Sequence, residues 1–141
     1  MALIVDAGAL YAQADVKEPR HAAVTRVLLA EQELLVTSEL AVAEADYLIL
    51  TRLGVGVELA FIEDLAQATF SVACLSQTEL RMARDLVERY RDLRLGLSDA
   101  SLAILAYRYQ TQRILTFDER AFRQVTPLQG GTFLILPADV W

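Results

Sequence analysis

The stretch LIVDAGAL, residues 3–10, places a single carboxylate, Asp6, between two apolar runs. The run that precedes it is too short for a helix and is rich in β-branched residues, which indicates a buried strand ending at the aspartate. A buried carboxylate without a partner is strongly destabilising. Asp6 therefore needs hydrogen-bond donors, a cation, or a place at a surface.

Short apolar runs of this kind alternate with longer helical patterns along the chain. The predicted strands are residues 2–5, 33–37, 70–75, 113–117 and 132–136. The predicted helices are residues 21–32, 38–53, 57–69, 76–92 and 98–110. Strands that alternate with helices predict an α/β fold, with a mostly parallel central sheet of about four to five strands flanked by helices on both faces. No linker or internal repeat divides the chain, so we expect one domain over residues 1–141.

The composition excludes several classes of protein. No apolar run is long enough to cross a membrane, and no basic segment precedes one at the N-terminus, so we expect a cytoplasmic protein without membrane contacts. The single cysteine, Cys74, cannot form an internal disulfide. Its apolar neighbours predict a small buried hydrophobe.

Positive charge is concentrated in the second half of the chain, although the formal net charge is -6. The net charge argues against a protein that coats nucleic acid electrostatically. Residues 81–141 nevertheless hold 9 of the 13 basic residues. Their arginines would form either a basic flank for a phosphate-bearing substrate or an ordinary solvated helix face. The arginines concerned are Arg81, Arg84, Arg89, Arg91 and Arg94.

Four carboxylates stand in apolar settings, where a packed core needs none. Asp6 and Asp118 each follow a predicted strand, so they emerge at the same sheet edge if the two strands are parallel neighbours. Glu44 is in helical register with Leu40, which places it on the expected buried stripe of its helix. Asp99 opens a later helix, just after the apolar turn LGL.

Each of the four also has a purely structural alternative. Asp6 and Asp118 would cap the helices that follow them. Asp99 would suit the first turn of its helix, and Glu44 would pair with an arginine. Together, however, converging carboxylates repel one another, and a divalent cation removes that cost. Oxygen ligands without a histidine or cysteine cluster favour Mg²⁺ or Mn²⁺, and such a site suits phosphodiester hydrolysis. The only histidine, His21, is expected at the solvated start of a helix.

The order and spacing of these segments resemble the PIN-domain nucleases, and within them the VapC-type toxins of bacterial type II toxin-antitoxin pairs. The resemblance covers essentially the whole chain. It rests on IVDAGAL (4–10), TSELAVAEADYLI (37–49), RYRDLRLGLSDASLAILAY (89–107), RILTFDERAF (113–122) and a terminal strand that ends in LP. It implies that the family's acidic quartet is formed by Asp6, Glu44, Asp99 and Asp118.

The resemblance further implies a Mg²⁺- or Mn²⁺-dependent endoribonuclease, commonly a homodimer, that cleaves RNA and is neutralised by a cognate VapB-type antitoxin. One departure from the family stands next to the first aspartate. Many relatives carry Thr or Ser there, whereas this chain has Ala7 and Gly8. We therefore expect the supporting hydroxyl to come from Thr116 or Ser98.

Two other classes of function stay open on the sequence alone. A PIN-fold binding module with weak or lost nuclease activity would explain Ala7, although the intact quartet argues against it. Another α/β carboxylate site, such as a phosphatase or a receiver domain, fits less well. The phosphatase would need an aspartate where Gly8 stands, and the receiver would need a lysine after a late strand, whereas the only lysine is Lys17.

Overall fold

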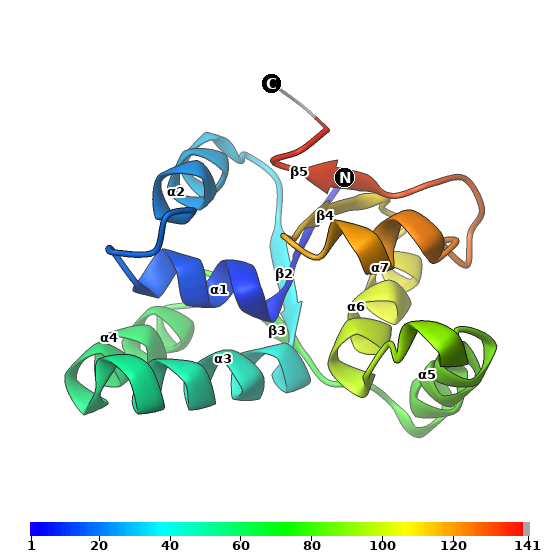
Figure 1. Ribbon diagram of the computed structural model, residues 1–141, viewed down its shortest axis with the longest axis horizontal. Coiled ribbons are helices and arrows are strands. Elements are labelled where there is room, and N and C mark those ends of the chain that lie inside the picture. The colour runs from blue at the N-terminus through cyan, green and yellow to red at the C-terminus, as the bar shows by residue number, and fades with distance from the viewer. Residues whose placement is uncertain (140–141) are drawn as a thin grey trace.

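The computed structural model of the chain describes residues 1–139. Five parallel strands form one sheet in the order β3-β2-β1-β4-β5 (Figure 1). The strands are β1 (Leu3–Val5), β2 (Leu35–Ser38), β3 (Ser71–Ala73), β4 (Arg113–Leu115) and β5 (Leu134–Leu136). All five predicted strands are confirmed, each within a residue or two of its expected position. β1 and β4 are parallel neighbours, as the placement of Asp6 and Asp118 requires.

Seven α-helices surround the sheet within residues 1–139, together with one short 3-10 turn at Arg91–Leu93. The helices are α1 (Ala7–Ala14), α2 (His21–Ala30), α3 (Glu39–Leu53), α4 (Val55–Ala66), α5 (Gln77–Arg89), α6 (Leu97–Arg108) and α7 (Glu119–Gln124). Figure 1 shows α1 to α4 on one side of the sheet and α5 to α7 on the other. The five predicted helices are confirmed, and α1 and α7 are the short helices that begin directly after Asp6 and Asp118.

Local signals explain where several helices begin and end. Ser38 Oγ accepts a hydrogen bond from Ala41 N at 3.0 Å and caps α3. Ser76 and Glu79 form a reciprocal capping box at the start of α5. Gly54, with a φ of 90°, ends α3 and leads into α4 through a backbone conformation that favours glycine.

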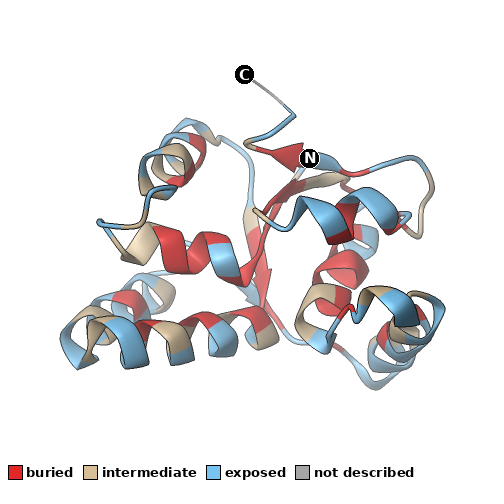
Figure 2. Ribbon diagram, viewed as in Figure 1, coloured by how far each residue is buried: buried red, intermediate tan, exposed pale blue. Residues whose placement is uncertain are grey.

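Helices on both faces bury the three central strands β2, β1 and β4 almost completely, whereas the edge strands β3 and β5 each have one exposed residue (Figure 2). All three residues of β1 are fully buried, which explains the continuous apolar run at the start of the chain. The structure also shows that the expected burial of Glu44 is wrong. The buried stripe of α3 consists of Ala41, Ala45 and Ile49, whereas Glu44 is exposed. Glu44 directly precedes Ala45, so its side chain points to one side of the buried stripe. It lies at the edge of the surface that α3 packs against the core and not within that surface.

Two further residues have surroundings that differ from the expected ones. Cys74 is exposed, because it lies just beyond the edge strand β3, where only alternate residues face the core. His21 is the first residue of α2 as expected, but its ring is half-buried. Its Nδ1 lies 2.8 Å from the carbonyl oxygen of Ala12 and so helps to join α2 to α1.

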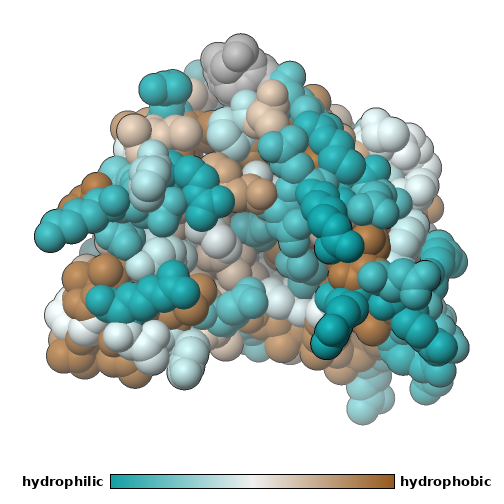
Figure 3. All heavy atoms as spheres, viewed as in Figure 1, coloured by the Kyte–Doolittle hydropathy of each residue, from teal (hydrophilic) through white to brown (hydrophobic). Residues whose placement is uncertain are grey.

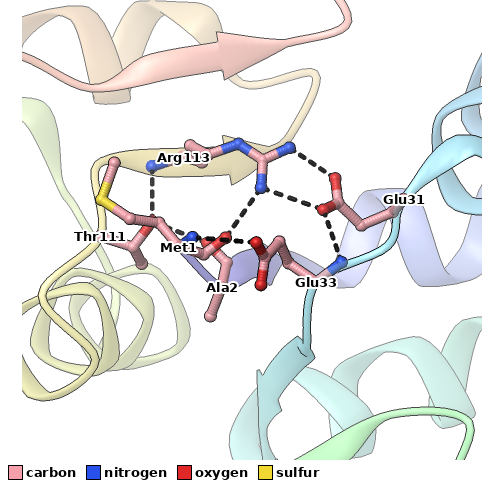
Figure 4. A network of polar contacts seen from close by, with 6 residues as sticks. All are labelled: Met1, Ala2, Glu31, Glu33, Thr111 and Arg113. Carbon is pink, nitrogen blue, oxygen red and sulfur yellow. Dashed lines mark hydrogen bonds and ion pairs between the residues drawn. The ribbon is translucent and has the colours of Figure 1, made fainter.

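A polar network fastens the N-terminal edge of the sheet, at the opposite end from Asp6 (Figure 4). The Arg113 guanidinium donates to both carboxylate oxygens of Glu31 and, at 2.9 Å, to the carbonyl oxygen of Met1. The Thr111 hydroxyl donates to Ala2 O at 2.7 Å. The ion pair with Arg113 lowers the pKa of Glu31. The network therefore joins the start of β1 to β4 and to the end of α2.

On the face of the molecule seen in Figure 3, apolar side chains gather over α3 and α4. The exposed large apolar residues of these two helices are Tyr47, Leu50, Val55, Leu59 and Ile62. Among the helices of residues 1–139, none combines the length and the apolar character that crossing a membrane requires.

Candidate active site

A hollow of about 410 Å³ opens at the carboxyl edge of the sheet, beside the ends of β1 and β4. The sheet order changes direction here, and α/β proteins bind ligands at such switch points. The starts of α1, α6 and α7 converge at this point in Figure 1. The hollow is lined by Asp6, Ala7, Gly8, Arg20, Glu44, Asp99, Phe117 and Asp118. All four carboxylates singled out in the sequence therefore face one space.

Asp6 follows β1 directly and is held by two hydrogen bonds. Its Oδ1 accepts from Ala9 N at 3.0 Å, which caps α1, and its Oδ2 accepts from the hydroxyl of Thr116. The N–H of Asp6 donates to Leu115 O at 3.1 Å and extends the pairing of β1 with β4. Burial raises the pKa of Asp6 to about 6, although the hydrogen bonds from Thr116 and Ala9 oppose the rise.

Thr116 also connects Asp6 to Asp118. The oxygen of the Thr116 hydroxyl accepts a hydrogen bond from Asp118 N at 2.9 Å while its proton is donated to Asp6. The Asp118 side chain accepts from Ala121 N at 3.2 Å and caps α7. Both aspartates are thus genuine helix caps, and capping fixes them at the edge of the hollow. The Thr116 hydroxyl thus contacts both aspartates, whereas Ala7, next to Asp6, has no hydroxyl.

Glu44 and Asp99 reach the hollow from helices on opposite sides of the sheet, α3 and α6. Ser98 Oγ donates to Glu44 Oε2 at 3.3 Å and so bridges the two helices beside the hollow. The hydroxyl oxygens of Ser38 and Ser101 lie 2.7 Å apart in the core and join the start of α3 to α6. These two polar contacts join α3, which carries Glu44, to α6, which carries Asp99.

Asp99 lies among like charges. Burial, followed by repulsion from Asp6, Asp118 and Glu44, raises the pKa of Asp99 to about 7. No hydrogen bond to its carboxylate offsets this rise among the residues that the structure describes. The oxygens of Asp99 therefore stay free to accept a water molecule or a cation.

The donor set of the hollow fits a hard divalent cation in its chemistry. Its four acidic side chains offer only oxygen ligands, and their mutual repulsion is the kind of cost that a bound cation removes. As they stand in residues 1–139, no three His, Cys, Asp or Glu side chains lie close enough to hold one ion. Binding a single ion would therefore require these side chains to rotate toward one another.

The arginines of residues 81–94 form a solvated helix face and not a wall of the hollow. All five are exposed on α5 and the turn that follows it. Arg84 pairs with Asp85 at 3.2 Å and with Glu88 at 2.5 Å, so part of this charge is neutralised locally. None of the five lines the hollow.

Two residues of the hollow were missed in the sequence, Arg20 and Phe117. Arg20 lies in the connection between α1 and α2, and its guanidinium carbon is 4.3 Å from the centre of the Phe117 ring. The two residues are far apart in the sequence. Arg20 belongs to none of the quoted segments, and Phe117 lies in RILTFDERAF without any feature that marks it as a contact of an arginine. Only the acidic quartet had a signal in the sequence, namely carboxylates next to apolar runs.

Comparison with known proteins matches most of the chain to one family. The model of the PIN domain family matches residues 3–127 of the chain. Ribonuclease VapC26 of Mycobacterium tuberculosis is 42% identical over 135 residues, which cover 96% of this chain and 100% of that protein.

Two solved structures share the fold at low sequence identity. The Mycobacterium tuberculosis toxin VapC20, described as cleaving the sarcin-ricin loop, matches with a TM-score of 0.78 at 17% identity over 83% of this chain and 90% of its own. VapBC2 of Rickettsia felis, solved with a DNA fragment from its promoter, matches with a TM-score of 0.66 at 12% identity over 96% and 97%. The family model and the close relative together show that the chain belongs to the PIN domain family.

Proposed function

We propose that the chain is a divalent-metal-dependent endoribonuclease and the toxin of a VapBC-type toxin-antitoxin pair. One observation carries the proposal: four carboxylates from separate segments line one hollow at the switch point of the sheet. The 42% identity to a protein named as a ribonuclease supports the same activity.

In this proposal Asp6, Glu44, Asp99 and Asp118 hold Mg²⁺ or Mn²⁺. Such an ion activates water and neutralises the charge that develops on a scissile phosphate. Asp6 and Asp118 are fixed by their capping bonds and by Thr116, so they form the rigid side of the site. Asp99, whose carboxylate accepts no hydrogen bond from the described residues, is best placed to orient the attacking water as a general base.

The direct test is incubation of the purified chain with single-stranded RNA and supplied Mg²⁺ or Mn²⁺. We expect discrete fragments from internal cuts, analysed on a denaturing gel and by sequencing of the new RNA ends. Intact RNA at protein concentrations that saturate the substrate would overturn the proposed activity.

Thr116→Val tests whether the hydroxyl of Thr116 compensates for Ala7. The substitution keeps the shape of the side chain but removes the donor to Asp6 and the acceptor for Asp118 N. Because groups that orient metal ligands typically contribute 10- to 100-fold, we expect RNA cleavage to fall by about 10-fold or more. Thr51→Val, on the exposed face of α3, is the matched control and should cleave like wild type. Equal activity of the two variants would remove Thr116 from the site.

The proposed partners are RNA, a cognate VapB-type antitoxin and a second copy of the chain. The structural match to VapBC2, a toxin-antitoxin complex by name, supports the antitoxin. The exposed apolar side chains of α3 and α4 offer a surface of the kind that partners cover. Co-expression with the product of the adjacent reading frame should give a stable complex without ribonuclease activity, in a cytoplasmic extract.

The alternative function, a PIN-fold binding module, is favoured only by Ala7. Thr116 and Ser98 each donate a hydrogen bond to a carboxylate of the quartet, so the site does not lack supporting hydroxyls. A binding module would also have no need of four carboxylates around one hollow.

A further inference from the structure

Arg20 is a cation at the rim of an otherwise acidic hollow. It occupies the N-cap position of α2, and among the described residues that line the hollow it is the only one with a positive charge. Its side chain is 53% exposed, so it is open to a ligand that approaches from solvent.

Two contacts hold the Arg20 side chain in place. Its Nε donates to Glu18 Oε1 at 2.9 Å, and its guanidinium carbon lies 4.3 Å from the centre of the Phe117 ring. Phe117 stands between Thr116, which donates to Asp6, and Asp118. The cation–π contact therefore ties the connection after α1 to the segment that carries two of the site's polar groups.

Arg20 lines the same hollow as the four carboxylates but is not paired with any of them in residues 1–139. Its one carboxylate partner there is Glu18. Because Glu18 takes only Nε, the terminal Nη groups have no protein partner among the described residues. The two Nη groups of a guanidinium are coplanar, and when neither has a partner they can bind a phosphate through two hydrogen bonds.

The negative charge of the hollow explains why a positive side chain would be needed there. A phosphate that approaches four carboxylates is repelled unless positive charge lies nearby. The arginines of residues 81–94 do not line the hollow, so Arg20 is the protein's own positive group at this position. We propose that Arg20 binds a backbone phosphate of the RNA next to the cleaved bond, with its guanidinium oriented by Phe117 and Glu18. This inference rests on the proposed ribonuclease function.

Arg20→Gln tests the inference, with Arg26→Gln as the matched control. Arg26 is an exposed arginine on α2 outside the hollow, so both variants lose one positive charge from the same region. We expect Arg20→Gln to raise KM for a short single-stranded RNA about 10-fold, with a smaller change in kcat. The slope of log(kcat/KM) against log[salt] should become shallower by about 0.7, the value for one lost phosphate contact on a single strand.

Three further variants separate phosphate binding from a structural role. Arg20→Lys keeps the charge, so it should keep most of the salt slope while losing part of the affinity. Phe117→Leu keeps apolar bulk but removes the aromatic face, and it should raise KM less than Arg20→Gln does. In an Asp99→Asn background, where we expect cleavage to be too slow to interfere, anisotropy of fluorescein-labelled RNA should show the same loss of binding when Arg20→Gln is added.

The outcomes distinguish the two proposals. If wild type does not cleave RNA, the proposed function fails. If wild type cleaves and Arg20→Gln matches Arg26→Gln in KM, salt slope and RNA anisotropy, the assignment of Arg20 is wrong while the ribonuclease function stands. An Arg20→Gln protein with a lowered kcat but an unchanged KM and salt slope would also overturn phosphate binding.

Discussion

Asp99→Asn is expected to reduce RNA cleavage by at least about 100-fold and at the same time to stabilise the metal-free protein. The loss of activity follows because Asp99 is the carboxylate of the hollow that no described residue supports with a hydrogen bond, and groups that only orient metal ligands already contribute 10- to 100-fold. The gain in stability follows from the raised pKa of Asp99, about 7, which records how strongly its surroundings oppose a negative charge.

The amide introduced by this substitution would occupy the same space as the carboxylate without its charge. Since Asp99 is partly exposed, solvent screening limits the gain, and we expect about 1 to 2 kcal/mol in the free energy of unfolding near neutral pH. Thermal unfolding in EDTA measures this as a rise in Tm. Asp92→Asn, an exposed acid in the turn before α6, is the control and should change neither Tm nor cleavage. An Asp99→Asn protein that cleaves like wild type would remove Asp99 from the catalytic site.

Removal of divalent ions is expected to abolish cleavage, and their addition to raise Tm in a pH-dependent manner. The pKa values of Asp6, about 6, and Asp99, about 7, both lie above the ordinary value of 3.8. The folded metal-free protein therefore binds more protons than the unfolded chain between about pH 4 and pH 7, and its stability falls as the pH rises through this window. The fall is caused by the burial of these carboxylates and by their mutual repulsion, and a divalent ion bound to them offsets both.

The size of the metal effect on Tm depends on pH because protons and the divalent ion compete for the same carboxylates. Near pH 5 protons already neutralise the two carboxyl groups, so Mn²⁺ should raise Tm only slightly, whereas near pH 8 it should raise Tm by several degrees. EDTA should reverse the shift and stop RNA cleavage, and a renewed supply of Mn²⁺ should restore both. A shift in Tm of equal size at both pH values would indicate that the ion binds elsewhere on the surface.

The sheet and its edge were predictable because the relevant signals are local. A run such as LIVD indicates both a buried strand and a carboxylate at its end, and a similar run precedes Asp118. Parallel pairing of β1 and β4 then brings the two aspartates together without further information. The capping residues Ser38 and Ser76 are similarly local, since their partners are three residues away.

The short helices and the position of Glu44 were harder to predict. In α1 the residues Ala7, Ala9, Leu10, Tyr11 and Ala12 are all buried, so the segment has no polar stripe that would mark its period. In α3 the core contact uses small residues such as Ala41 and Ala45. Of the larger side chains in register with Glu44, Tyr47 is exposed, and Leu40 and Leu48 are only partly buried. Size alone is a poor guide where helices pack closely.

Arg20 had no signal in the sequence, because its role depends on tertiary contacts. Arg20 contacts Phe117 only because the connection after α1 folds back against the end of β4, and Glu18 holds the guanidinium there. The concentration of arginines in the second half of the chain pointed to α5, where the charge lies in solvent and is partly paired. The charge balance of a segment thus did not locate the cation that lines the hollow.

Calorimetric titration of Mn²⁺ into wild-type protein and into Asp99→Asn, with Asp92→Asn as the control, shows whether the carboxylates of the hollow share a cation. We expect saturable binding to wild type and to Asp92→Asn, with an affinity at least about 10-fold weaker for Asp99→Asn. Binding of equal affinity to all three proteins, or no binding to any of them, would contradict a metal site formed by Asp6, Glu44, Asp99 and Asp118.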